Sequence, residues 1–148
     1  FRNEQRLMLA KIPYSGMAVC SDVGARHDVH PTDKKTVGER LALWALRDVY
    51  GQRITASGPL PLSARYKQGK VVIRFAHGNG LQTASAAPLQ GFSLNGASPV
   101  AAQIRHNKII ISTPAKPEAV YYGWQPYSNG NLLNAAQLPA STFKIAVQ

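Results

Sequence analysis

Hydrophobic and polar positions alternate with a helical period in the first third of the chain. Residues 2–12 are good helix formers, and Pro13 ends the run. Leu9 and Ile12 contribute to one apolar side at helical spacing. The pattern therefore predicts a short amphipathic helix over residues 2–12.

A second and clearer helix is predicted over residues 32–50. Thr32 can cap its start, Asp33 favours the first turn, and Gly51 stops it. The apolar face comprises Val37, Leu41, Ala42, Trp44, Ala45, Leu46 and Val49. The charged residues that fall mostly outside this face are Glu39, Arg40, Arg47 and Asp48.

A short apolar run, residues 17–20, lies between the two predicted helices. Such a run fits a strand covered on both faces in a parallel sheet, and a loop over residues 21–31 follows it. Helix, strand, loop and helix in this order are typical of the tail of an α/β sheet. Ligand sites in such sheets lie beyond the carboxyl ends of the strands, which is where Asp28 and His30 fall.

After Gly51 the pattern changes to short strands separated by turns. Residues 57–61 form a linker-like stretch rich in proline and glycine, and residues 71–76 then alternate between apolar and other positions. Further strands are predicted over residues 92–94, 100–104, 108–112 and 119–124. This spacing suggests a β-sandwich or jelly roll. We place the domain boundary near residue 53, which gives domains of residues 1–52 and 53–148.

Composition and charge narrow the partners of the chain. The net charge is +10, and residues 51–148 hold nine Lys/Arg against one acid, Glu118. These basic residues are scattered and match no nucleic-acid motif, so no nucleic-acid partner is expected. No apolar run approaches the roughly 20 residues that span a bilayer, so no membrane partner is expected either. Cys20 is the only cysteine and is predicted to be an inert buried thiol.

The loop over residues 21–31 holds the candidate chemistry. Histidine suits a general base because its pKa lies near neutrality, and His30 is the best candidate. Asp28 is close enough to accept a hydrogen bond from the ring and hold its tautomer, whereas Asp22 could do the same or brace the loop. A lone Asp-x-His-Pro sequence is also compatible with a loop of capping groups. No spacing of His, Cys, Asp or Glu predicts a metal site.

The aromatic residues near the end of the chain offer a second interpretation. Tyr121, Tyr122, Trp124 and Tyr127 could stack on a sugar ring, although some of them are expected in the core. On this alternative the β-domain is a non-catalytic glycan-binding module.

Several motifs together resemble the last block of the sialate O-acetylesterases. The motifs in the first third are Gly16-Met-Ala-Val-Cys-Ser-Asp-Val-Gly24, Asp28-Val-His-Pro31, Lys34 and Val37-Gly-Glu-Arg-Leu-Ala42. Those in the remainder are Ser57-Gly-Pro-Leu60, Leu89-Gln-Gly-Phe92, Tyr122-Gly-Trp124, Asn131-Leu-Leu-Asn134 and Leu138-Pro-Ala-Ser-Thr-Phe143. The likeness covers nearly the whole chain and keeps the order of the motifs.

The resemblance implies the C-terminal end of a flavodoxin-like SGNH α/β domain, followed by a small, jelly-roll-like β-sandwich. It implies a serine carbohydrate esterase that removes O-acetyl groups from sialic acid or related sugars without a cofactor. His30 would be the catalytic base and Asp28 its partner. Many relatives have Asp-x-x-His instead, where this chain has His27 in the acid position.

The resemblance also places the nucleophilic serine and the oxyanion hole in earlier blocks of the family. The chain alone should therefore be inactive, and its expected partners are an acetylated sugar and the N-terminal part of the same enzyme. The chain begins with Phe1 rather than methionine, and no signal peptide is recognisable. We therefore expect a processed subunit or a piece of a longer chain. The family's usual setting is secreted, periplasmic or lysosomal.

Overall fold

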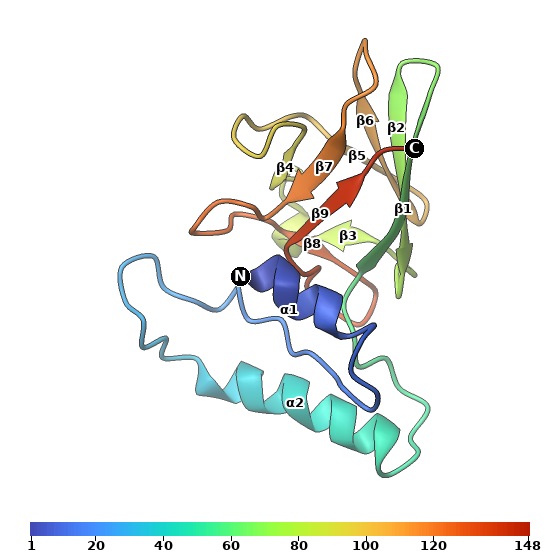
Figure 1. Ribbon diagram of the computed structural model, residues 1–148. Helices are drawn as coiled ribbons and strands as arrows, with labels where there is room; N and C mark the ends of the chain where they lie inside the picture. Colours follow the sequence, from blue (N-terminus) through green and yellow to red (C-terminus); the bar gives the residue numbers. More distant parts are fainter.

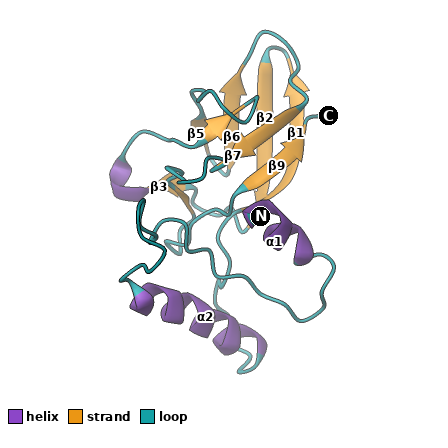
Figure 2. Ribbon diagram, turned by 60° about the vertical axis from the view of Figure 1, so that its left-hand side comes forward, coloured by secondary structure: helices purple, strands orange, loops and turns teal.

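A computed structural model describes residues 1–148 and contains two α-helices and nine strands (Figure 1). The helices are α1 (Arg2–Met8) and α2 (Lys34–Asp48), and a 3-10 turn spans Ala84–Ala86. The strands are β1 (Leu60–Lys67), β2 (Lys70–Ala76), β3 (Gln82–Thr83), β4 (Phe92–Ser93), β5 (Gln103–Arg105), β6 (Lys108–Ser112), β7 (Ala119–Tyr122), β8 (Leu132–Leu133) and β9 (Phe143–Ala146). Both helices lie at one end of the molecule, with α1 against the sheets and α2 farther out (Figures 1 and 2). Neither helix is long and apolar enough to cross a membrane.

The strands form antiparallel sheets around one core. A four-stranded sheet has the order β1-β2-β6-β5, a three-stranded sheet the order β4-β7-β9, and β3 pairs with β8. The central core combines buried side chains from all three sheets: Ala64, Val71, Ile73, Leu81, Phe92, Ile109, Ile111, Val120, Tyr122, Leu132, Ala140, Phe143 and Val147. This β-rich architecture is compatible with the expected β-sandwich, whereas the jelly-roll connectivity stays a prediction.

The alternation predicted for residues 71–76 is realised in β2. Val71 and Ile73 are fully buried and pair in register with Ile111 and Ile109 of β6, which are also fully buried. Each such side chain contributes about 1.5–3 kcal/mol when it leaves water. These four residues therefore make the pairing of β2 with β6 the centre of the larger sheet.

The linker expected over residues 57–61 is in part strand. β1 begins at Leu60, and its pairing register shifts between Pro61 and Ser63. Because β1 is an edge strand, the missing N–H of Pro61 is tolerated at this irregularity. The prolines in residues 57–61 favoured a linker in the sequence prediction, although β1 begins within this stretch. Strands β3, β8 and β9 were also missed.

Both predicted helices form, with shorter bounds. The first ends at Met8 rather than at residue 12, and the second starts at Lys34 because Asp33, not Thr32, is its N-cap. The Asp33 carboxylate accepts hydrogen bonds from the Thr36 backbone N–H at 2.9 Å and from the Thr36 hydroxyl at 2.7 Å.

The strand predicted over residues 17–20 is wrong. This segment is extended but pairs with no other strand of the chain, and no parallel sheet forms around it. Instead, the carbonyl of Met17 accepts a hydrogen bond from Trp44 Nε1 at 3.2 Å, and that of Val19 accepts one from Arg40 at 2.6 Å. A strand needs a neighbour to bond its backbone, and here side chains of α2 take that place.

The region between residues 48 and 60 contains neither helix nor strand, and the boundary predicted near residue 53 falls inside it. That boundary stays a prediction. Contacts cross this boundary, and the first of them is made by Arg2 of α1, which reaches the sheet end of the molecule. Its guanidinium donates to Thr142 Oγ1 at 2.8 Å and to the carbonyls of Gly123, Gln125 and Pro126.

Candidate active site

The candidate site lies on residues 21–33, here called the site loop, which α2 holds at both ends. At the far end, Asp33 caps the helix. At the near end, the carboxylate of Asp22 accepts two hydrogen bonds from the guanidinium of Arg40, at 2.7 and 2.6 Å. Asp22 thus braces the loop, the second of the two roles that its sequence position suggested.

Arg40 is the residue that the sequence pattern misplaced. It was expected outside the buried face of the helix, yet it is only 9% exposed. Its guanidinium turns inward because both Asp22 and the Val19 carbonyl accept its hydrogen bonds. The hydrogen bond to Asp22 is the main cause that raises the pKa of Arg40. The sequence shows only that a basic residue occupies this position of the helix, and it does not identify Asp22 as the residue that Arg40 binds.

Asp28 and His30 lie side by side at the tip of the site loop. His30 Nδ1 is 3.3 Å from Asp28 Oδ1, and the same oxygen accepts a hydrogen bond from the His30 backbone N–H at 2.8 Å. The two side chains are 86% and 60% exposed. A carboxylate beside Nδ1 favours the proton on that nitrogen, which leaves Nε2 free to act as a base. The pair can therefore do the chemistry expected of it, and its catalytic role stays a prediction.

No group of three or more His, Cys, Asp and Glu side chains in the chain could hold a metal ion. The thiol of Cys20 donates a weak hydrogen bond to the Ala18 carbonyl at 3.4 Å. Burial is the main cause that raises the pKa of this thiol, so it is a poor nucleophile at neutral pH.

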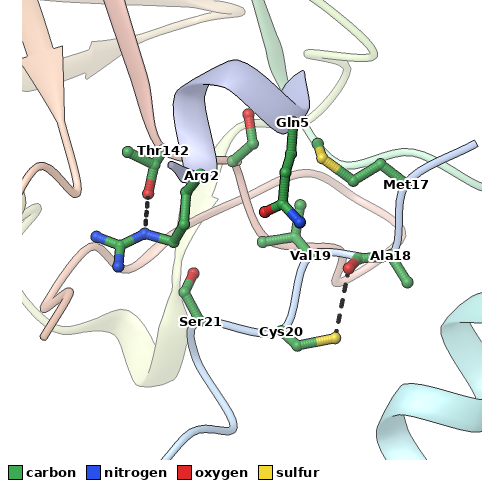
Figure 3. A pocket seen from close by; sticks show the side chains of 9 residues that line it. Arg2, Gln5, Met17, Ala18, Val19, Cys20, Ser21 and Thr142 are labelled. Atoms are coloured by element: carbon green, nitrogen blue, oxygen red, sulfur yellow. Dashed lines mark hydrogen bonds between the residues drawn. The ribbon is translucent and has the colours of Figure 1, made fainter. Parts of the chain in front are cut away.

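A pocket of about 370 Å³ lies between α1 and the extended segment before the site loop (Figure 3). Its lining residues are Arg2, Gln5, Met17, Ala18, Val19, Cys20, Ser21, Ser141 and Thr142. It includes neither Asp28 nor His30. The buried Ser141 hydroxyl has no hydrogen-bond partner in the chain. This pocket therefore borders the site loop only through Ser21.

All strands lie within residues 60–148, here called the β-sheet part. A second pocket of about 370 Å³ lies between the start of the site loop and loops of the β-sheet part. Ser21 and Asp22 line it on one side, and residues 127–131 and Gln137 on the other. Close by, the guanidinium of Arg26 lies 4.7 Å from the centre of the Tyr127 ring. The structure thus places the site loop against the 127–131 loop, a contact that the sequence did not predict.

The aromatic residues named from the sequence divide between the core and the surface. Tyr122 is buried, stacks on Phe143, and accepts a hydrogen bond from the Leu132 N–H at 2.9 Å. Burial raises its pKa well above the ordinary value. Trp124 is 39% exposed and packs edge-on against Tyr121 at 5.1 Å, and Lys144 lies over the Tyr121 ring. Only the exposed members of this group are available for a ligand.

Comparison with known proteins gives one informative likeness. No family model matches the chain, and neither does any curated protein. The chain is similar to the crystal structure of XAC1771, a novel carbohydrate acetylesterase from Xanthomonas citri, with 37% sequence identity and a TM-score of 0.86. This likeness supports a relationship to carbohydrate esterases. The match covers 95% of this chain, which spans about a third (34%) of the length of XAC1771. The likeness supports this broad relationship only, and membership of the sialate O-acetylesterases stays a prediction.

Proposed function

We propose that this chain is the part of a serine carbohydrate esterase that supplies the catalytic base. The whole enzyme would remove O-acetyl groups from sialic acid or a related acetylated sugar. The observation that carries the proposal is the 37% identity with a carbohydrate acetylesterase over nearly the whole chain. The 3.3 Å approach of Asp28 to His30 Nδ1 supports it with suitable chemistry.

In this mechanism a serine hydroxyl from the rest of the enzyme attacks the acetyl carbonyl, and His30 Nε2 takes the hydroxyl proton. The tetrahedral intermediate then collapses, the ester bond to the sugar breaks, and His30 gives its proton to the leaving sugar oxygen. A water molecule, activated by the same histidine, hydrolyses the acetyl-serine and releases acetate. Asp28 holds the ring and stabilises the imidazolium in both halves of the reaction.

The partner in this proposal is the preceding part of the same enzyme, which would carry the serine. Nine of the twelve exposed large hydrophobic residues fall within the first 50 positions: Phe1, Leu7, Met8, Ile12, Tyr14, Val29, Leu41, Val49 and Tyr50. Such a concentration of apolar surface is typical of a region that packs against another protein surface, which supports the proposal. The chain's coverage of only 34% of XAC1771 supports a large additional segment. A secreted, periplasmic or lysosomal location belongs to the same proposal.

The test is ester hydrolysis by the complete enzyme, with His30→Ala beside the unmodified protein. Loss of the base of a triad lowers turnover by roughly a millionfold. His27→Ala is a matched control, since it removes a histidine three residues away in the same loop and should retain turnover. Asp28→Asn should lower kcat by about 10⁴-fold, because the amide favours the wrong tautomer of the ring. Unchanged turnover in His30→Ala would overturn the assignment.

A glycan-binding module without chemistry is the second candidate. The exposed Trp124, supported by Tyr121 and near Lys144, favours it. Titration of the β-sheet part with O-acetylated and unmodified N-acetylneuraminic acid, with and without Trp124→Ala, measures that role. Loss of binding in the variant with esterase turnover intact would favour a separate binding function.

A further inference from the structure

We propose that the pocket between the site loop and the 127–131 loop is a sugar-binding subsite of the esterase, so that the β-sheet part helps to choose the substrate. This inference rests on the proposed function and adds to it the residues that hold the sugar. The position of the pocket supports the inference. Its wall is formed jointly by Ser21 and Asp22, which begin the site loop, and by residues of the β-sheet part.

The chemistry of the lining suits a polyhydroxylated ligand. Of the eleven lining residues only three are hydrophobic, one of them Tyr127 with its polar hydroxyl, and the others include Ser128, Asn129 and Gln137. Hydroxyl and amide groups both donate and accept hydrogen bonds, which is what a sugar ring requires. A volume of about 370 Å³ lies within the range of roughly 300–1,000 Å³ typical of small-molecule sites.

Two of these amides make no hydrogen bond within the chain. The side chains of Asn129 and Gln137 are exposed and unpaired, whereas Asn131 is occupied in fixing the loop. Asn131 donates to the Pro88 carbonyl at 2.9 Å and accepts from the Gln90 N–H at 2.9 Å. The Ser128 hydroxyl accepts from the Gly130 N–H at 3.2 Å. The loop is thus held by some of its polar groups and leaves others free for a ligand.

Contacts within the chain also determine the net charge of the pocket. Asp22 is the only acidic lining residue, and the guanidinium of Arg40 neutralises it through two hydrogen bonds. Because the carboxylate is already paired, it does not repel an acidic sugar from the pocket. Arg26 adds a positive charge beside Tyr127. The subsite therefore accepts a neutral or an acidic sugar.

The pocket lies beside the loop that carries the proposed catalytic pair, Asp28 and His30. Asp22 lies in the pocket wall, and Asp28 and His30 follow it in the same loop. Arg26, between them in sequence, rests on Tyr127 of the facing loop at 4.7 Å. Any sugar held against residues 127–131 therefore lies beside the loop that carries the base. The β-sheet part then acts in positioning the substrate rather than in the chemical step.

The experiment compares three esters as substrates of the complete enzyme. Two are sugars, O-acetylated N-acetylneuraminic acid and glucose pentaacetate, and the third is p-nitrophenyl acetate, which has no sugar to fill the subsite. Asn129→Ala should lower kcat/KM for the preferred sugar about tenfold, through a raised KM, and leave p-nitrophenyl acetate unaffected. Tyr127→Ala should lower kcat/KM for the preferred sugar by more than Asn129→Ala does. Gln103→Ala removes an exposed amide on β5 outside this pocket and is the matched control.

The outcomes separate the two proposals. If the unmodified enzyme hydrolyses neither sugar ester, the proposed function and the subsite both fail. If it hydrolyses them and both pocket variants retain sugar activity, only the subsite is overturned. An equal loss on the sugar and on p-nitrophenyl acetate in both variants also overturns it, because that loss shows damage to the site loop rather than to sugar recognition.

Discussion

Arg40 shows how one side chain organises the approach to the candidate site. Its guanidinium bonds Asp22 at the start of the site loop and the Val19 carbonyl in the segment before it. The backbone of that segment has no strand partner, so this contact replaces part of the bonding that a sheet would supply. The ion pair is largely removed from water and is therefore screened little by salt.

We expect Arg40→Met to destabilise the protein by about 3 kcal/mol, because it leaves the Asp22 carboxylate partly buried without its cation. Thermal or urea unfolding measures the loss, and hydrogen exchange should show faster opening of the site loop. Arg47→Met is the matched control on the same helix. Its pair with Asp48 is 31% and 46% exposed, so its loss should cost about 1 kcal/mol or less. Equal destabilisation by both variants would contradict the bracing role.

The candidate pair was predictable from the sequence, whereas its support was not. Asp28 and His30 are two residues apart before a proline, and this spacing alone brings their side chains within reach in a loop. Arg40 lies 18 residues from Asp22, and its inward turn depends on how α2 packs. The contact of Arg26 with Tyr127 joins positions about a hundred residues apart, which no local pattern encodes.

The start of α2 depends on a choice between two neighbouring cap residues. Thr32 and Asp33 both suit an N-cap, and the structure uses Asp33 because its carboxylate reaches Thr36 twice. These hydrogen bonds favour the charged form and lower the pKa of Asp33 below its ordinary value of 3.8. The helix start is therefore sensitive to acid, and it is also the point where the site loop ends.

Asp33→Ala should lower the melting temperature by a few degrees at pH 7, since α2 loses its cap. Because the folded-state pKa of Asp33 is depressed, its contribution is present above the unfolded-state pKa and is lost as pH falls through the folded value. The difference in melting temperature from the unmodified protein should therefore shrink as the pH falls below the ordinary Asp33 pKa of 3.8. Thr32→Ala is the control and should leave stability nearly unchanged. A constant difference at all pH values would argue against the charged cap.

The sequence predicted those strands in which buried and exposed residues alternate regularly. β2 and β6 have fully buried residues at alternate positions, and these runs were recognised. β3 and β8 have two residues each, too few to show any period. Residues 17–20 failed for another reason. Their composition predicts a strand, but strand formation depends on neighbours that this chain does not supply.

At the scale of the whole molecule, apolar exposure is unevenly distributed. The sheets enclose a complete core, whereas the first 50 residues hold nine of the twelve exposed large hydrophobic side chains. α1 is anchored to the sheet end through Arg2, but α2 is held mainly by residues 16–20 and the site loop. A short helix with an uncovered apolar face has little stability of its own. We therefore expect the helical part to depend on a partner more than the sheets do.

The 148-residue chain alone should thus bind a hydrophobic dye such as ANS and self-associate, because both processes remove its exposed apolar surface from water. Hydrogen exchange should be fast in α1 and α2 and slow at Ile73 and Ile109, which serve as internal controls in the core. In the complete enzyme, the preceding part should cover the helices and slow their exchange by at least tenfold, with no change at the core amides. Dye binding should fall in parallel. A monodisperse monomer that binds no dye, with helices protected as well as its strands, would contradict both the need for a partner and the proposal that this chain is one part of a larger catalytic domain.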